Sequence, residues 1–250
     1  KIINLMRDVL IRADKIDSNY TFEYLKRSLV SFSNIKLVLS GVDNNTRNKL
    51  AVEYFENIKN SKFANKNPFF WLQYGIQTLE QKKYELADNY FDTALSFATK
   101  KGYDDFYQIN AQKARGIMES IIAKNLKATD TYSYFIKVHS LLVRDLEKKS
   151  NRKDYQLGQG RLYENYYLKY YKALDHPKKI DFRNKINTYI EYLRQYVYES
   201  TKNNSKLGDN IKQSYKSVKR VYSSINDWKL YFHTSQNIKI SSVIICDGIE

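Results

Sequence analysis

The chain has 250 residues, of which only 8 are glycine and 2 are proline, and this scarcity argues against collagen, β-propellers and turn-rich β-sandwiches. Hydrophobic residues make up 42% and aromatic residues 15%, which is more apolar surface than a disordered chain carries. The 42 Lys and Arg residues outnumber the 27 Asp and Glu residues and leave a net charge of +15, a balance that suits an acidic protein or a nucleic acid as partner.

Apolar residues recur at helical spacing along nearly the whole chain. The pattern predicts helices over 2–13, 20–41, 44–60, 69–80, 84–99, 104–124, 129–149, 155–175, 178–201 and 208–233. Pro68 suits the start of one helix and Gly41 the end of another. Residues 237–245 are rich in β-branched side chains and are typical of a strand, but no second strand is predicted to pair with them. We therefore expect a helical-repeat domain over 1–235 and a tail over 236–250 that is strand-like or irregular.

One stretch combines large and small residues at the spacing of a helix–turn–helix unit. Trp71 and Gly75 lie on one predicted helix, and Ala87, Phe91 and Ala94 lie on the next. In such a unit Gly75 lets the second helix approach closely, and Ala87 is the small residue opposite that approach. These spacings resemble the tetratricopeptide (TPR) motif, with Trp71 packing into the pair and Phe91 and Ala94 facing the next one.

The second-helix signature recurs on both sides of this unit. A small residue precedes an aromatic residue by four positions at Ala51 and Phe55, and again at Ala128 and Tyr132. The offsets from Ala87, 36 and 41 residues, are unequal, as in degenerate TPR-like arrays. Each pair leaves an apolar face that only a neighbouring pair can cover. We therefore expect an all-α fold, a TPR-like helical-repeat solenoid of about ten helices, with a concave groove formed by the first helices of successive pairs.

Two segments carry a further likeness: NPFFWLQYGIQTLEQKKYELADNYFDTALSFA at 67–98 and YDDFYQINAQKARGIME at 103–119. They resemble the C-terminal helical-repeat region of bacterial anti-phage proteins, the STAND ATPases of the Avs group and related sirtuin-domain defence proteins. The resemblance implies a sensor whose repeats clasp a phage structural or packaging protein, after which a central ATPase oligomerises and switches on an N-terminal effector. The chain has no G-x-x-x-x-G-K-[ST] loop, so we expect it to bind no ATP. It begins at Lys1 rather than Met, and we expect it to be a piece of a longer polypeptide.

No constellation of residues in the sequence predicts catalysis. Asp175, His176 and Asp181 form the nearest approach to a metal site, but they fall in a predicted inter-helix turn where solvated polar residues are typical. His139 lies among apolar residues, and we expect a hydrogen-bonded, semi-buried imidazole. The single Cys246 excludes an internal disulfide and favours a reducing cytoplasm. We expect no catalytic, metal-binding or cofactor-binding residues, no enzymatic activity, no membrane span and a cytoplasmic location.

A basic stripe in the second half of the chain is the candidate partner-binding feature. Lys212, Lys216, Lys219 and Arg220 share nearly one helical face, either as a solvated surface or as a complement to an acidic partner. Residues 126–250 carry 23 basic and 13 acidic side chains. The sequence therefore favours a protein-binding helical-repeat sensor domain that recognises a phage protein within a larger antiviral protein, with nucleic-acid binding through the basic second half as the alternative.

Overall fold

We analysed a computed structural model, which describes residues 43–60, 64–102, 106–148, 152–203 and 205–233, together with residues 8, 12, 15 and 16. Within these ranges every regular element is a helix, and no strand occurs. The all-α prediction is therefore confirmed for the described residues. Apart from the four isolated residues, the predicted helices over 2–13 and 20–41 lie outside the described residues, as does the tail over 236–250.

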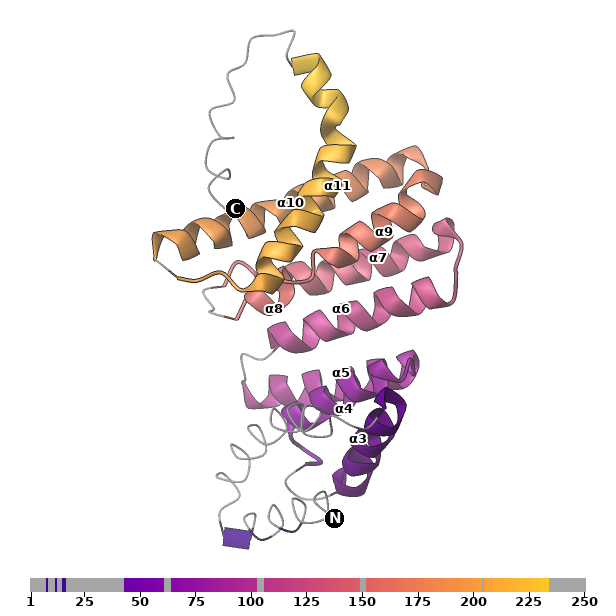
Figure 1. Cartoon of the computed structure of the whole chain (residues 1–250), viewed down its shortest axis with the longest axis vertical. Coiled ribbons are helices and arrows are strands. Elements are labelled where there is room, and N and C mark those ends of the chain that lie inside the picture. Colours follow the sequence, from indigo (N-terminus) through magenta and orange to yellow (C-terminus); the bar gives the residue numbers. More distant parts are fainter. Residues whose placement is uncertain are drawn as a thin grey trace.

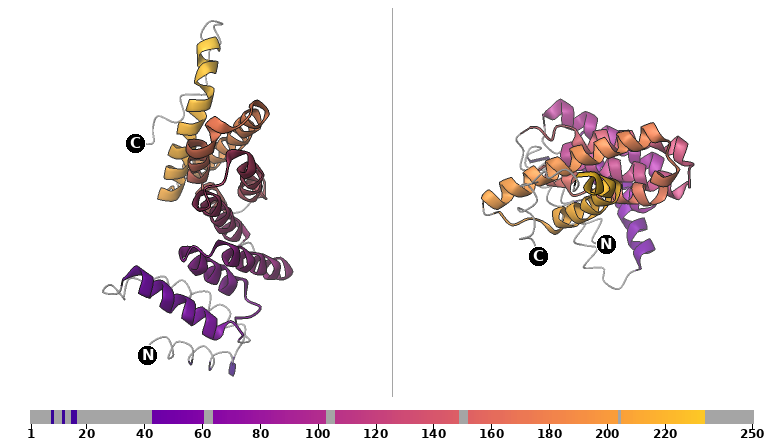
Figure 2. Two further views of the ribbon diagram at one scale, coloured as in Figure 1. Left: turned by 90° about the vertical axis from the view of Figure 1, so that its right-hand side faces the viewer. Right: turned by 90° about the horizontal axis from the view of Figure 1, so that it is seen from above.

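The observed helices follow the predicted order. They are α3 (Asn44–Ile58), α4 (Pro68–Glu80), α5 (Tyr84–Lys101), α6 (Phe106–Ala123), α7 (Ala128–Val143), α8 (Asp154–Leu157), α9 (Arg161–Tyr170), the 3-10 helix η1 (Tyr171–Ala173), α10 (His176–Lys202) and α11 (Asp209–His233). Helices α3 to α7 pack successively, each against the next, and are arranged along the long axis of the molecule (Figure 1). Helix α11 packs against both α9 and α10 and extends beyond them at one end (Figure 2).

Local chemistry explains why several helices begin and end where they do. The Asp43 side chain accepts hydrogen bonds from two backbone N–H groups of α3. Asn67 caps α4 in the same way, and Pro68 follows as the first helical residue, where its missing N–H has no cost. The Asp175 side chain caps α10. Gly102 ends α5 with a φ of 67°, a left-handed conformation that glycine adopts without steric penalty.

The α4–α5 pair has the close packing that the motif spacing predicts. A Cβ atom on Gly75 would lie 2.6 Å from the ring of Phe91, so only glycine leaves room for that ring. Ala87, Phe91 and Ala94 are fully buried in the same apolar cluster. Trp71 is half-buried, and its indole N–H donates to the backbone carbonyl of Asn65 at 2.8 Å. These contacts join the two helices into one packed unit.

The interior between α6 and α11 is rich in tyrosine. Buried phenol hydroxyls require hydrogen-bond partners, because an unpaired polar group is costly away from water. The Tyr163 hydroxyl lies 2.8 Å from His139 Nδ1, and the Tyr166 hydroxyl lies 3.1 Å from the Thr131 hydroxyl. Tyrosine therefore contributes both apolar packing and specific ties between helices in this part of the molecule.

Helix α7 ends earlier than the predicted range of 129–149. It stops at Val143, and Asp145 adopts a positive φ of 60° that turns the chain. The turn buries Leu146, and the Tyr107 hydroxyl of α6 donates to the Asp145 carbonyl at 2.9 Å. These tertiary contacts stabilise the turn against continuation of the helix.

The predicted helix over 155–175 is wrong as a single element, because it is divided into α8, α9 and η1. Gly160 lies at the division, where its backbone N–H donates to the Ser214 hydroxyl of α11 at 2.8 Å. A Cβ at this position would lie 2.6 Å from both the Ser214 carbonyl oxygen and Val218 Cγ2. The division therefore allows α11 to pack directly against the α8–α9 junction.

Candidate protein-binding cleft

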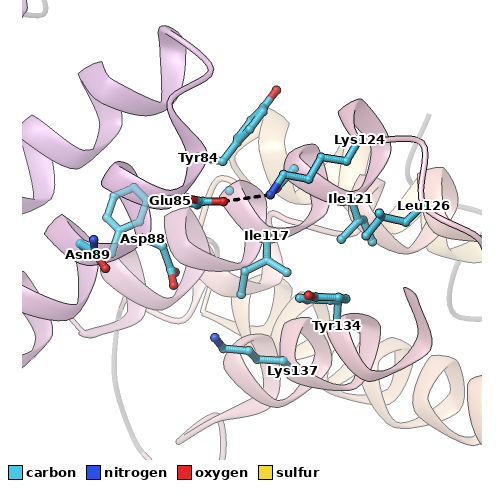
Figure 3. A pocket seen from close by; sticks show the side chains of 13 residues that line it. Tyr84, Glu85, Asp88, Asn89, Ile117, Ile121, Lys124, Leu126, Tyr134 and Lys137 are labelled. Atoms are coloured by element: carbon cyan, nitrogen blue, oxygen red, sulfur yellow. Dashed lines mark hydrogen bonds and ion pairs between the residues drawn. The ribbon is translucent and has the colours of Figure 1, made fainter. Parts of the chain in front are cut away.

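An open cleft of about 280 Å³ lies over α6, between α5 on one side and α7 on the other. We call it the α5–α7 cleft, and Figure 3 shows it at close range. It is lined by Tyr84, Glu85, Asp88, Asn89, Phe91, Gly116, Ile117, Ser120, Ile121, Lys124, Leu126, Tyr134 and Lys137. No α4 residue lines it, so this cleft is distinct from the predicted groove between the first helices of successive pairs.

The floor of the cleft is apolar because α6 turns one helical face toward it. Ile117 and Ile121 are one turn apart and are each more than nine-tenths buried. Leu126 is half-buried just beyond the end of α6, and Tyr134, on the α7 side of the cleft, is 45% exposed. The cleft thus offers an apolar base and two accessible aromatic side chains, the half-buried Tyr84 and the more exposed Tyr134 (Figure 3).

The two sides of the cleft carry opposite charges. Helix α5 contributes Glu85 and Asp88, whereas Lys124 follows α6 and Lys137 lies on α7. Glu85 and Lys124 form an ion pair of 3.1 Å across the mouth (Figure 3). Both side chains are at least half exposed, so this pair contributes little to stability and can exchange for other partners. No ion pair joins Lys137 to any carboxylate in the described part of the chain.

The cleft exists because α5 and α7 both pack against α6. One apolar cluster, which includes Phe91, packs α5 against α4 and α6. Another cluster, which includes Ile117 and Ile121, extends from α6 toward α11. On α6 the two clusters meet, and Lys113 crosses from α6 to within 3.1 Å of Asp88 on α5. This buried lysine fixes α5 against α6 beside the cleft.

A second polar group lies within the bundle between α7, α9 and α10. Burial, together with the nearby positive charge of Lys185, lowers the pKa of His139 to about 4, so the imidazole is neutral near pH 7. It is hydrogen-bonded to Tyr163, which agrees with the expected semi-buried role. Close by, the Tyr132 hydroxyl donates to Asp181 at 2.7 Å, and Lys185 pairs with the same carboxylate at 3.1 Å. The group joins three helices, and its phenols have raised pKa values because of burial.

Within the nearest approach to a metal site, the two carboxylates, Asp175 and Asp181, have different partners. Asp175 caps α10 by accepting from the backbone N–H of Lys178 at 2.9 Å, while Asp181 binds Tyr132 and Lys185. No group of three or more potential ligands occurs among the residues that the structure describes. Likewise, none of the described helices is both long enough and apolar enough to cross a membrane.

The basic face of α11 is only partly available. Lys212, Lys216 and Lys219 are exposed, and Lys212 lies 3.9 Å from Asp209. Arg220 instead makes a two-pronged hydrogen bond with Glu164 of α9, at 2.8 and 3.1 Å. This contact ties α11 to α9, so Arg220 serves an internal contact within the chain rather than standing free for a partner.

The motif residues lie mainly inside the helix pairs. Phe91 alone among them reaches the cleft, at its base, whereas Phe55 and Tyr132 are buried elsewhere. Ala128 is half-buried, and the side chain of Ala51 lies outside the described residues.

The sequence analysis did not predict the residues that supply the charged groups and the exposed ring of the cleft: Glu85, Lys124, Tyr134 and Lys137. Their polarity marked them as exposed, but nothing in the sequence indicated that α5 and α7 leave an opening between them.

Comparison of the chain with known proteins identifies no related protein. No family model, no curated protein and no solved structure matches the chain.

Proposed function

We propose that this chain is a protein-binding region built as a degenerate TPR-like solenoid, and that it recognises a phage structural or packaging protein within a larger bacterial antiviral protein. The α5–α7 cleft carries the proposal, because it combines an apolar base with an exposed aromatic ring and charged sides. Protein interfaces have this arrangement, in which a desolvated apolar centre is surrounded by a polar rim. The target class comes from the likeness to the STAND ATPases of the Avs group.

The properties of the cleft favour binding over catalysis. Its volume of about 280 Å³ lies below the ~300–1,000 Å³ of typical small-molecule sites. The neutral His139 and its tyrosine partner lie in the packed interior rather than along the cleft. The cleft residues instead form an accessible surface on successive helices, as expected for recognition of a macromolecule.

A capture experiment tests the proposal directly. The immobilised 250-residue chain is exposed to purified phage portal, terminase and tail proteins, and we expect one of them to be retained. Tyr134→Ala should weaken that complex by about thirtyfold, because exposed tyrosines at interface centres act as anchors worth about 2 kcal/mol. Tyr198→Ala, which removes a 57% exposed tyrosine on α10, is the matched control and should leave affinity unchanged. Retention of none of the phage proteins contradicts the proposal.

Nucleic-acid binding is the second candidate, supported by the exposed lysines of α11. If Lys216 and Lys219 contact phosphates, affinity for DNA or RNA falls with salt at about 0.7–0.9 log units per log unit of salt for each contact. Replacing both lysines with glutamine then reduces that slope by nearly two. Absence of retention on heparin and DNA at low salt excludes this candidate.

A further inference from the structure

The opposite charges on the two sides of the α5–α7 cleft restrict what the cleft can accept. Glu85 and Asp88 line the α5 side, where the Asp88 carboxylate is also paired with the buried Lys113, and Lys124 and Lys137 line the other. A partner with a single sign of charge meets repulsion on one side, whereas a partner carrying both signs is attracted on both. The base of the cleft, between these two charged sides, is apolar, so it favours a partner segment with an apolar residue between its basic and acidic residues.

The shape of the cleft suits a helix lying along it. The lining residues of α5 run from Tyr84 to Phe91, a rise of about 10 Å at 1.5 Å per residue, or two helical turns. A volume of about 280 Å³ admits inserted side chains but not a helix backbone, so the partner lies above the cleft and projects its anchors into it. Amphipathic helices bind grooves in this way, through apolar residues spaced at i, i+3 or i+4 and i+7.

We propose that the α5–α7 cleft binds a two-turn amphipathic helix of the partner protein, with an apolar stripe facing Ile117, Ile121 and Tyr134, basic residues facing α5 and acidic residues facing Lys124 and Lys137. This inference rests on the proposed function and specifies the chemistry of the partner segment. The exposed Glu85–Lys124 pair opens on binding, and its two members pair instead with the basic and acidic flanks of the incoming helix. Little stability is lost in this exchange, because exposed ion pairs contribute about 0–1 kcal/mol.

Designed peptides provide the test. Fluorescence anisotropy measures binding of the whole chain to peptides of about 16 residues, a length at which isolated helices become marginally stable. The peptides share a stripe of leucines and differ only in their flanks, which are basic and acidic, both basic, or both acidic. We expect the mixed peptide to bind about tenfold more tightly than either single-sign peptide. A mixed peptide with a central proline, which breaks the helix, should lose this advantage.

A charge reversal in the cleft should change the ranking. Lys137→Glu leaves Lys124 as the one basic side chain lining the cleft, so the peptide with two basic flanks should gain about tenfold over the mixed peptide. Lys202→Glu on α10 makes the same change in net charge at an exposed lysine that does not line the cleft and should leave the ranking unaltered. The inference is overturned if the wild-type chain binds none of the peptides or binds all of them equally. It is also overturned if the proline peptide binds as well as its parent, or if Lys202→Glu changes the ranking as Lys137→Glu does.

The outcome is separable from that of the proposed function. If the chain captures a phage protein, Lys137→Glu does not change that capture, and the chain shows no preference among the peptides, this inference is wrong. The proposed function then still stands. If the peptides rank as expected but no phage protein is captured, the proposed target is wrong. The inference that the cleft binds an amphipathic helix with basic and acidic flanks then still stands.

Discussion

Phe91 shows how a few atoms determine the packing of a whole helix pair. Its ring lies against Gly75 of α4 on one side and Gly116 of α6 on the other. A Cβ on Gly75 would lie 2.6 Å from the ring, whereas a Cβ on Gly116 would lie 3.8 Å from it, in ordinary van der Waals contact. The two glycines therefore have different roles, although both face the same buried aromatic residue.

We expect Gly75→Ala to lower stability, and Gly116→Ala to leave it unchanged or raise it. Gly75→Ala gains helix propensity but forces a fully buried aromatic ring to shift, so the net change should be a loss of about 1–3 kcal/mol. Gly116→Ala has the same propensity gain of up to about 1 kcal/mol without a clash and should be neutral or stabilising. Urea unfolding of both variants measures the difference. Equal effects of the two substitutions would contradict the assigned role of Gly75.

His139 should make stability depend on pH. Its pKa is about 4 in the folded chain, below the ordinary value of 6.5, because the buried imidazole resists charging. The unfolded chain therefore binds more protons between these values, and stability rises with pH across that interval. The contribution of His139, roughly 3 kcal/mol, is present above about pH 6.5 and is lost as the pH falls toward 4.

The variant His139→Gln isolates this contribution. Chemical unfolding at a series of pH values from 4 to 7 should show a shallower loss of stability on acidification than in the parent chain. An equal slope in both proteins would mean that His139 does not titrate in the folded state as described.

At the scale of elements, the junction between α8 and α9 is held by side chains from two other helices. Tyr189 of α10 donates to the carbonyl oxygens of Gln156 and Leu157, at 2.7 and 2.9 Å. Ser214 of α11 donates to the Leu157 carbonyl and accepts from the backbone N–H of Gly160. The junction is thus a meeting point of α8, α9, α10 and α11.

Tyr189→Phe should destabilise this junction. The substitution keeps the ring but leaves the buried Gln156 carbonyl without that hydroxyl donor, at an expected cost of about 1–3 kcal/mol. Tyr198→Phe removes a hydroxyl from an exposed tyrosine of the same helix and should change stability by less than about 0.5 kcal/mol. Thermal unfolding of the two variants provides the comparison, and similar melting temperatures would refute the role of Tyr189.

The same junction shows why the sequence predicted the helices better than their interruptions. The apolar period continues through Tyr155, Leu162 and Tyr166, and helix interiors tolerate single glycines, so a continuous helix was the natural prediction. The interruption depends on the approach of Ser214, which lies 54 residues away from Gly160 in the sequence. The spacing of apolar residues along the chain carries no information about a contact between residues so far apart in the sequence. By contrast, the starts of α4 and α10 depend on local capping residues and could be predicted closely.

At the scale of the whole molecule, stacking creates a surface that no single helix carries. The sequence predicted an all-helical chain and the tight α4–α5 unit around Gly75. It did not predict the α5–α7 cleft, because the cleft depends on the separation of two helices that both pack on a third. The basic stripe of α11 was predicted to lie on one face, but its Arg220 is bound to Glu164 of α9. The sequence predicted which face of the helix carries basic residues, but not which of those residues form ion pairs with other helices.

Hydrogen–deuterium exchange of the chain with and without its captured phage protein tests the central claim most directly. We expect slower backbone exchange on complex formation in the cleft-forming segments 84–91, 116–126 and 134–137, with little change along α11. Protection confined to α11 or to α4, with no change at the cleft, would contradict the assignment of the α5–α7 cleft as the binding surface.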